Sequence, residues 1–189
     1  MIIHSKHDIL QLISEDEWMM DIIRAAKRLE LPDWWVCAGF VRTKVWDVLH
    51  GFDERTPLAD VDVVYFDKSN TDEAVEKEYE QKLHLMLPGI PWSVKNQARM
   101  HKINGIPPYV SSTDAISKFP ETVTSLGVKL DDQDRLILTA PHGIKDVLDM
   151  RVKPTPYFCE SQDRLAVYKR RITEKNFSAK WGKISVDPM

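Results

Sequence analysis

The sequence predicts an α+β fold, a small mixed β-sheet flanked by helices, and three observations support that class. Short runs of apolar, β-branched and aromatic residues, such as 34–38 and 61–66, alternate along the chain with helical segments. A polar turn at 131–134 separates two further apolar runs and indicates a hairpin. The 189 residues, 43% of them hydrophobic, suffice to bury one core. We therefore expect a single domain over 1–189, with the C-terminal helix and tail from about residue 160 as an appendage.

Composition excludes several classes of protein. The formal charge of -3 and the pI of about 6.1 do not indicate a general nucleic-acid binder. The two cysteines, Cys37 and Cys159, lie far apart and do not suggest a disulfide framework. No apolar run has the length of a membrane span or of a signal peptide. We expect a soluble cytoplasmic protein with no membrane partner, and the sequence does not predict its oligomeric state.

The chain begins with helical residues 8–29, where apolar side chains recur at helical spacing. Ser5 followed by Asp8 can cap the start, and Ser14 with Glu17 offers a second capping box. Two capping signals within one helical stretch predict two helices that meet near Ser14.

A buried strand is predicted at 34–38, because these residues are continuously apolar. Gly39 follows, where the backbone can turn sharply or approach a ligand. Residues 40–49 read as a helix whose first N–H groups could meet an anion. Trp46 in this helix is more typical of a core residue than of a platform for a base.

The strand predicted at 60–67 begins with two carboxylates, Asp60 and Asp62. Residues two apart on a strand share a face, so these carboxylates repel each other unless a cation lies between them. Oxygen ligands at this spacing suit Mg²⁺. Chance is the alternative, since Asp132 and Asp134 repeat the pattern in a polar turn. Only the first pair leads into an apolar strand, and it is our candidate metal site.

The second half of the chain alternates helices and strands. The sequence predicts helices at 72–86, 97–102 and 161–174, a strand at 92–96, and hairpin strands at 126–130 and 136–139. Asn96, Gln97 and His101 follow a strand end, where ligands often bind, although a structural hydrogen-bond network explains them equally well. The basic last helix could meet RNA or another acidic partner, or simply face water. We expect the tail beyond Phe177 to be loose.

Five blocks of sequence share one resemblance. They are Ala38-Gly39-Phe40-Val41-Arg42 with Val45-Trp46-Asp47, Ala59 to Asp67, Asn96 to His101, Ala140 to Gly143, and Arg151 to Pro156. Together they resemble a bacterial nucleotidyltransferase-like family within the DNA polymerase beta-type superfamily. The resemblance implies metal-dependent transfer of a nucleoside monophosphate from an NTP to an acceptor, which could be a small molecule, a protein or an RNA. It also implies Mg²⁺, with two ions held by three carboxylates.

The resemblance assigns roles to particular residues. Asp60 and Asp62 would be the catalytic and metal-binding pair. The candidate nucleotide-binding residues are Gly39, Arg42, Lys44, Asn96, Gln97 and His101. The sequence departs from the superfamily pattern twice, because the usual second Gly and Ser after the first strand are absent and the strand at 92–96 carries no acid. The alternatives are therefore a catalytically weak or inactive nucleotide-binding protein, or an interaction module on the same scaffold.

Overall fold

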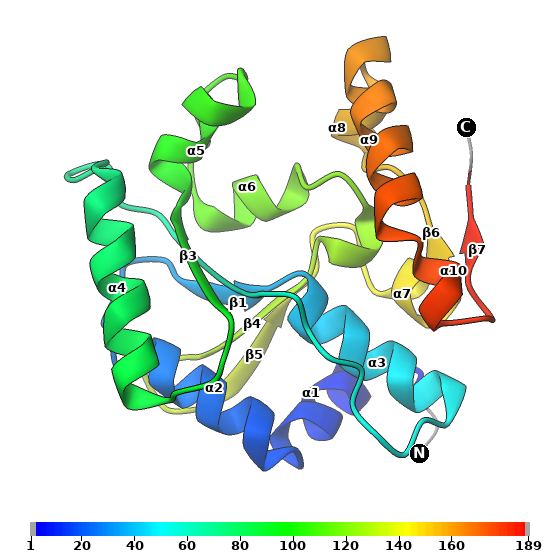
Figure 1. Ribbon diagram of the computed structural model, residues 1–189, viewed down its shortest axis with the longest axis horizontal. Coiled ribbons are helices and arrows are strands. Elements are labelled where there is room, and N and C mark those ends of the chain that lie inside the picture. Colours follow the sequence, from blue (N-terminus) through cyan, green and yellow to red (C-terminus); the bar gives the residue numbers. More distant parts are fainter. Residues whose placement is uncertain (1–2, 188–189) are drawn as a thin grey trace.

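The computed structural model describes residues 3–187, so residues 1–2 and 188–189 of the predicted domain lie outside the described part. A mixed five-stranded sheet forms its centre, in the order β3-β2-β1-β4-β5 (Figure 1). The strands are β1 (Trp35–Cys37), β2 (Val61–Tyr65), β3 (Trp92–Asn96), β4 (Gly127–Leu130) and β5 (Leu136–Thr139). β2 and β3 run parallel, and the other neighbours are antiparallel. The predicted α+β class and its small mixed sheet are confirmed.

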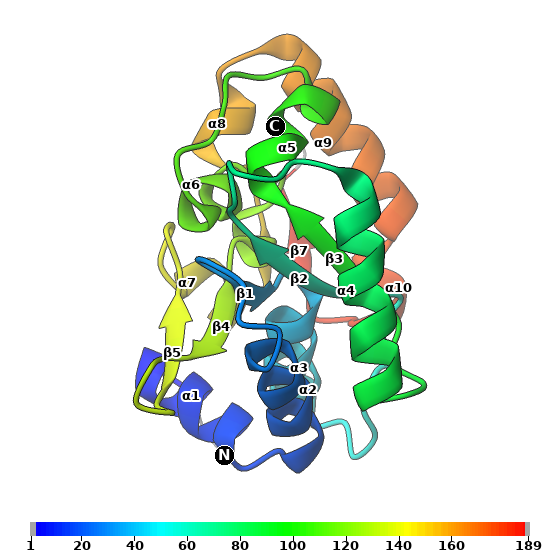
Figure 2. The same cartoon turned by 90° about the vertical axis from the view of Figure 1, so that its left-hand side faces the viewer.

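Helices cover both faces of the sheet (Figure 2). One face carries α1 (Lys6–Ser14), α2 (Glu17–Lys27) and α3 (Gly39–His50). On the other lie α5 (Gln97–Asn104), α6 (Ser112–Ser117), α8 (Pro156–Cys159) and α9 (Gln162–Lys175). The charged helix α4 (Glu73–Met86) connects β2 to β3, as a parallel pair requires a crossover. None of the helices within residues 3–187 is both long enough and apolar enough to cross a membrane.

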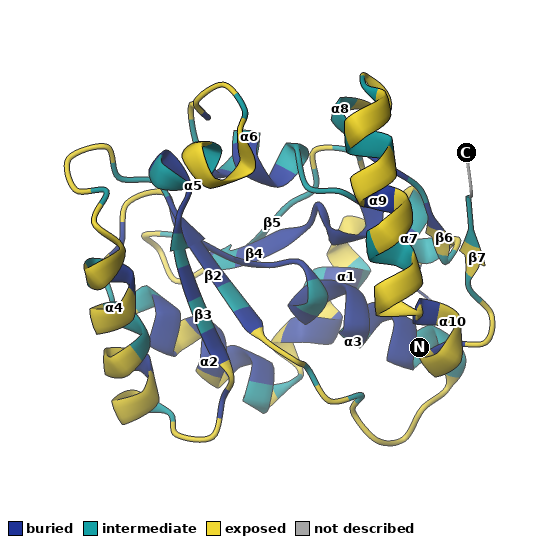
Figure 3. Ribbon diagram, turned by 45° about the horizontal axis from the view of Figure 1, so that its top comes forward, coloured by how far each residue is buried: buried dark blue, intermediate teal, exposed yellow. Residues whose placement is uncertain are grey.

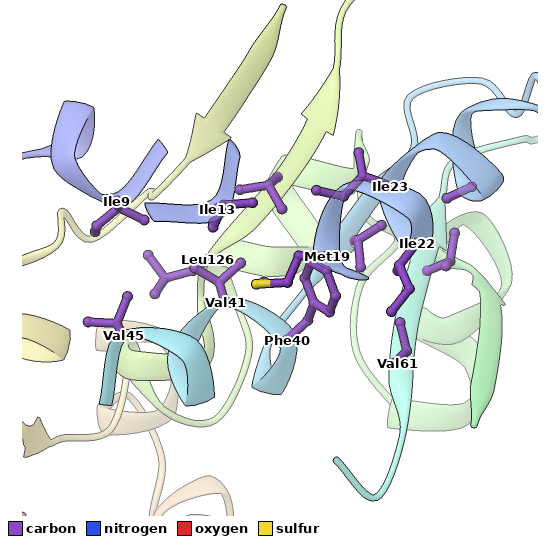
Figure 4. Close-up of a cluster of buried hydrophobic side chains, with 14 of the residues drawn as sticks. Ile9, Ile13, Met19, Ile22, Ile23, Phe40, Val41, Val45, Val61 and Leu126 are labelled. Carbon is purple, nitrogen blue, oxygen red and sulfur yellow. The ribbon is translucent and has the colours of Figure 1, made fainter. Parts of the chain in front are cut away.

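The two faces are buried to different depths. The helices α1, α2 and α3 press apolar side chains against the inner face of the sheet, whereas much of α9 stays exposed (Figure 3). Figure 4 shows the centre of the main core, which includes Ile13, Met19, Phe40, Val61 and Leu126. On the opposite face a smaller apolar cluster gathers Trp35, Cys37, Ala38, Val64 and Ile116. This second face therefore leaves room for a site.

The first two helices meet near Ser14 as predicted, but one of the two caps differs. Ser5 and Asp8 form the expected capping box at the start of α1. At α2 the prediction was wrong, because the N-cap is Asp16, whose carboxylate accepts from Met19 N. The hydroxyl of Ser14 instead donates to a carbonyl one turn back in α1, at 2.8 Å. A hydroxyl with that bond is no longer available to cap the next helix.

The C-terminal segment packs onto the fold as far as residue 187, so the expectation of a loose tail was wrong for the described residues. It contains α10 (Phe177–Lys180) and β7 (Ser185–Val186), and β7 pairs in parallel with β6 (Arg151–Val152). The other short elements are η1 (Thr122–Thr124) and α7 (Lys145–Leu148). Trp181 is 2% exposed, and its indole N–H donates to Asp47 of α3 at 2.8 Å. Burial of an aromatic ring with its polar atom paired is what anchors the tail.

Candidate functional site

Asp60 and Asp62 lie at the beginning of β2, on the face that the N-terminal helices leave uncovered. Asp62 is aligned with Cys37 of β1 and with Ser93 of β3. Both carboxylates line one cavity, as their spacing on a strand requires. Burial and the neighbouring Asp60 raise the pKa of Asp62 to about 6. Within residues 3–187 neither carboxylate forms a direct ion pair, although Arg171 and Lys175 lie close enough to lower the pKa of Asp62.

The turn between β1 and α3 presents backbone donors to the same cavity. Ala38 has φ 57° and ψ -119°, a region that glycine favours and that costs another residue about 1–3 kcal/mol. No side chain caps the 12-residue helix that begins at Gly39. Ala38 and Gly39 both line the cavity. The strained turn thus directs the positive end of the α3 dipole toward the carboxylates.

Arg42 is a buried cation with unused donors. Its guanidinium carbon lies 4.8 Å from the ring centre of Phe177, 5.1 Å from Trp46 and 5.4 Å from Trp181. One bond, from Nη2 to Thr43 Oγ1 at 3.2 Å, is made, and the buried Nε has no partner. Burial lowers the pKa of Arg42 to about 10, which still leaves it charged at neutral pH. A side chain held this way is ready for an anion.

Asp62 lines two cavities, and the smaller one, of about 250 Å³, lies between α3, β2 and the C-terminal segment. Its cationic side chains are Arg42, Arg171, Lys175 and Lys180. Arg171 pairs with the buried Glu121 at 2.6 Å. In the part of the chain that the structure describes, the other three have no carboxylate partner. The cavity therefore combines two carboxylates with several free cations, which suits a metal-bound polyanion.

A larger cavity of about 630 Å³ adjoins the first. Four residues line both, namely Ala38, Asp62, Thr124 and Arg171. The larger cavity extends from the sheet toward α5, α6, α8 and α9, and many of its lining residues are apolar or aromatic. Asp62 therefore lies at the junction of a small cationic cavity and a large, more apolar one.

Two further predicted residues lie near these cavities but play different parts. Gln97 lines the larger cavity, and its side-chain amide donates to the Lys95 carbonyl at 3.3 Å. Asn96 is turned to the other side and caps α5, with its Oδ1 accepting from Ala98 N and from Asp67 N. Because the amide of Asn96 is fully used, it has little capacity left for a ligand.

Lys44 and His101 are not brought to the site. The Lys44 ammonium pairs with Asp16 at 2.7 Å and lines neither cavity. Asp16 also accepts two hydrogen bonds from Arg55, so these three side chains join α2, α3 and the loop after α3. His101 is half-buried in α5, outside both cavities. The structure therefore unites Gly39, Arg42, Asp60 and Asp62, and separates Lys44 and His101 from them.

The strand beside Asp62 carries no third carboxylate. On β3, Ser93 is aligned with Asp62 and Lys95 with Val64, so Ser93 and Lys95 face the cavity side. Within residues 3–187 no group of three or more His, Cys, Asp or Glu side chains could hold a metal. Glu121 lines neither cavity and is already bonded to Arg171 and Thr124.

The two aspartates nevertheless fit a magnesium ion. Mg²⁺ usually binds one or two protein carboxylates and completes its shell with water and substrate phosphates. Asp60 and Asp62 provide two carboxylates without a cation, beside cationic side chains suited to phosphates. Burial raises the pKa of Asp62 most and the neighbouring Asp60 raises it further, and a bound cation would stabilise the charged form against both effects. This donor set suits a metal that arrives with a phosphate ligand.

The residues of the smaller cavity that were not predicted as site residues include Arg171, Lys175, Lys180 and Trp181. One signal was visible in the sequence, because Arg171 and Lys175 are four residues apart and so share a helix face. The basic character of this helix was equally compatible with a solvated surface. Only the packing of Phe177 and Trp181 on α3 brings these cations to Arg42.

Comparison with known proteins gives a family and a set of related structures. Residues 24–186 match the family model described as nucleotidyltransferase. The chain is similar to a solved protein described as a CCA-adding enzyme head domain, at TM-score 0.88 and 34% identity, covering 99% of this chain and 98% of that one. A CCA-adding enzyme with CTP (TM-score 0.57, 12% identity) and one with ATP (0.52, 15%) share the fold. These two matches include 99% and 88% of this chain, but only 44% and 41% of the respective CCA-adding enzymes. This chain therefore spans less than half of their length. No curated protein matches.

Proposed function

Because the chain belongs to the nucleotidyltransferase family, we propose that it is a Mg²⁺-dependent enzyme that transfers a nucleoside monophosphate from an NTP to an acceptor. The observation that carries the proposal is the unpaired Asp60–Asp62 pair at the junction of a cationic cavity and a larger one. The complexes of CCA-adding enzymes with ATP and CTP support an NTP as the donor. Because this chain spans less than half the length of those enzymes, the proposal does not adopt their acceptor for this chain.

The smaller cavity is proposed to bind the triphosphate. Arg42, which lines the cavity, would contribute its guanidinium, and the N-terminus of α3 would supply backbone N–H groups. Lys175 and Lys180 reach the same space from the C-terminal segment. Charge-assisted bonds of this kind are about twice as strong as neutral ones. The aromatic rings around Arg42 fix its direction, so it loses little conformational freedom when it binds.

The residues then divide the work of an in-line displacement. An acceptor oxygen attacks the α-phosphorus, the bond to the bridging oxygen breaks, and pyrophosphate leaves with the electron pair. Asp60 and Asp62 would hold magnesium, which when bound neutralises the phosphates and orients them. Arg42, Lys175 and Lys180 stabilise the charge that develops on pyrophosphate. Asp62, at the junction of the cavities, fixes where the α-phosphate lies.

A nucleotide-binding protein without turnover is the second candidate, because β3 carries no third acid. Such a protein would use the same triphosphate contacts and would bind Mg²⁺ together with the NTP. It differs from the enzyme only in releasing no pyrophosphate. Binding and turnover therefore have to be measured separately.

The first test is calorimetric titration of ATP and CTP, with and without Mg²⁺. We expect Mg²⁺-dependent binding that falls by about 100-fold or more in Asp60→Ala/Asp62→Ala, since two charged contacts are lost. The matched control is Asp132→Ala/Asp134→Ala, which removes the same charge at the same spacing from the turn between β4 and β5. Equal affinity in wild type and the Asp60/Asp62 variant would contradict the proposed site.

Turnover decides between the two candidates. Transfer of the label from α-labelled NTP to an acceptor, together with pyrophosphate release, is expected for the enzyme when cell-derived small molecules and RNA are offered as acceptors, and both are lost in the Asp60/Asp62 variant. Tight Mg²⁺-dependent binding with no release from any NTP would favour the binding protein.

A further inference from the structure

The larger cavity lies where an acceptor has to approach. In an in-line displacement the attacking and leaving oxygens stand on opposite sides of the phosphorus. If pyrophosphate leaves among Arg42, Lys175 and Lys180 in the smaller cavity, the acceptor comes from across Asp62. That side is the larger cavity, which shares Asp62 with the smaller one. Its volume of about 630 Å³ is within the range of small-molecule sites.

The residues that line this cavity indicate the chemical character of the molecule that fits it. Apolar and aromatic residues form much of the lining, among them Met100, Ile106, Tyr109, Phe119, Tyr157 and Phe158. The charged residues of the lining are Lys95, Lys118, Arg164, Arg170 and Arg171, with Asp62 as the single carboxylate. Each cation is paired within 4.0 Å with a carboxylate outside the lining, so the cations face the cavity while their partners do not. The Arg164 guanidinium stacks on Tyr157 at 3.7 Å, a surface suited to a flat ring. The lining favours an apolar or aromatic body that carries negative charge.

Lys95 brings a cation to the reaction end of this cavity. It is aligned with Val64, two residues beyond Asp62, and faces the same side of the sheet. Its partner Glu76 lies at 3.4 Å and is mainly bonded to Arg99, at 2.8 and 3.0 Å. Because Glu76 is shared in this way, the Lys95 ammonium keeps donors for a ligand.

A lysine at this position selects the kind of nucleophile. An alcohol is a weak nucleophile until its proton is removed, and metal-ion catalysis usually lowers its pKa. The strand that faces Asp62 offers Ser93 and Lys95 instead of a third carboxylate, and an ammonium repels a second metal ion. A carboxylate or a phosphate monoester is already ionised at neutral pH and is attracted by Lys95.

Resting on the function proposed above, we propose that the acceptor is a small apolar or aromatic molecule whose nucleophile is an anionic oxygen. It binds in the larger cavity with that oxygen at Lys95. The oxyanion attacks the α-phosphorus, a new P–O bond forms, and the bond to the bridging oxygen breaks. Pyrophosphate takes the electron pair, and no proton has to be removed. The product is a mixed anhydride with the nucleoside monophosphate, and Lys95 acts as a positioning residue.

The binding test uses two fluorescent probes that share the same aromatic skeleton and differ only in one sulfonate group. 8-Anilinonaphthalene-1-sulfonate is anionic, and N-phenyl-1-naphthylamine is its neutral counterpart. We expect the anion to bind wild type at least tenfold more tightly than the neutral probe. Lys95→Met should abolish this preference and Lys95→Arg should keep it. The control is Lys77→Met on α4, since Lys77 is also paired with a glutamate but lies outside both cavities.

Three results of this test would overturn the assignment. The first is equal affinity for the two probes, and the second is a preference that survives in Lys95→Met. The third is full displacement of the anionic probe by MgATP, since the larger cavity would then be the nucleoside site. Thermal unfolding of each variant verifies that the probes report on the folded protein. If the probe preference is present but MgATP does not bind, the function proposed above fails while the anion site stands.

The reaction test compares acids with matching alcohols. Pyrophosphate release from MgATP and MgCTP is measured with cinnamate, benzoate and phenyl phosphate, and with cinnamyl alcohol, benzyl alcohol and phenol. We expect at least one acid to raise the rate tenfold or more over NTP alone, and its matching alcohol to leave the rate unchanged. Lys95→Met should raise the KM for that acid more than it lowers kcat. Acceleration by alcohols alone, or by no compound in the set, would overturn the assignment.

Discussion

Two groups of buried or half-buried charges in this protein differ in how completely they are satisfied. Asp47, Glu76 and Glu121 each accept several hydrogen bonds from described neighbours. Arg42 retains a free Nε, and Asp62 has no ion-pair partner among residues 3–187. Burying a charge without a partner is costly, and folding gains nothing from it. The comparison teaches that satisfied charges hold the fold, while unsatisfied ones mark the place where a ligand supplies the missing partner.

The largest expected effect breaks a satisfied charge. Glu76 is fully buried, and Glu76→Ala leaves Arg99, Lys95 and the Asn96 N–H without their acceptor. We expect the free energy of unfolding to fall by about 3–5 kcal/mol, the usual cost of breaking a buried pair. Urea denaturation measures it. The affinity of the folded fraction for MgATP should stay within threefold, because Glu76 lines neither cavity. If Glu76→Ala were as stable as wild type, the distinction between satisfied charges that hold the fold and unsatisfied charges that mark the site would not stand.

An intermediate effect comes from replacing an unsatisfied charge by an apolar side chain. Arg42→Met fits among three aromatic rings, so the free energy of unfolding should stay level or rise by about 1–4 kcal/mol. MgATP affinity should fall by about tenfold to 100-fold, since a hydrogen bond to a charged group contributes about 1.5–3 kcal/mol. Arg99→Met is the matched control, and it should lower stability without changing affinity. Loss of stability in Arg42→Met would show that Arg42 serves the fold.

The smallest effect concerns Lys44, a predicted site residue that lies away from the cavities and pairs with Asp16. Burial raises the pKa of Asp16, but hydrogen bonds from Lys44 and Arg55 outweigh it and hold the pKa below its ordinary value of 3.8. Since the folded pKa is the lower one, Asp16 stabilises the protein above the unfolded pKa, and this contribution disappears as pH falls through the folded pKa. Asp16→Asn should cost about 1 kcal/mol or less at pH 7, and nothing once both states are protonated.

Thermal unfolding of wild type and Asp16→Asn between pH 7 and pH 2.5 measures this difference. Lys44→Met should behave like Asp16→Asn and leave MgATP affinity unchanged. Weakened MgATP binding in Lys44→Met would mean that Lys44 reaches the phosphates, and the separation seen in the structure would not hold during binding.

The sequence predicted the five strands of the central sheet and most helices correctly because local patterns carry that information, but it missed β6 and β7. The continuous apolar run at β1, the polar turn before β5 and the capping box at Ser5 each act within a few residues. The same locality explains the failure at α2, where Asp16 and Ser14 both carry capping oxygens two residues apart. Choosing between them depends on how α2 packs and on the Lys44 and Arg55 partners of Asp16, which come from distant segments.

What the sequence determined by itself is that Asp60 and Asp62 share a strand face, because side chains alternate with a fixed period on a strand. What only the tertiary structure decided is which cations meet that face. Arg42 and Lys44 are neighbours on one helix, yet Arg42 faces the cavity and Lys44 faces Asp16. The cations of α9 and α10 arrive through the packing of Phe177 and Trp181 on α3. Periodicity places residues on a common face, but long-range packing selects what that face meets.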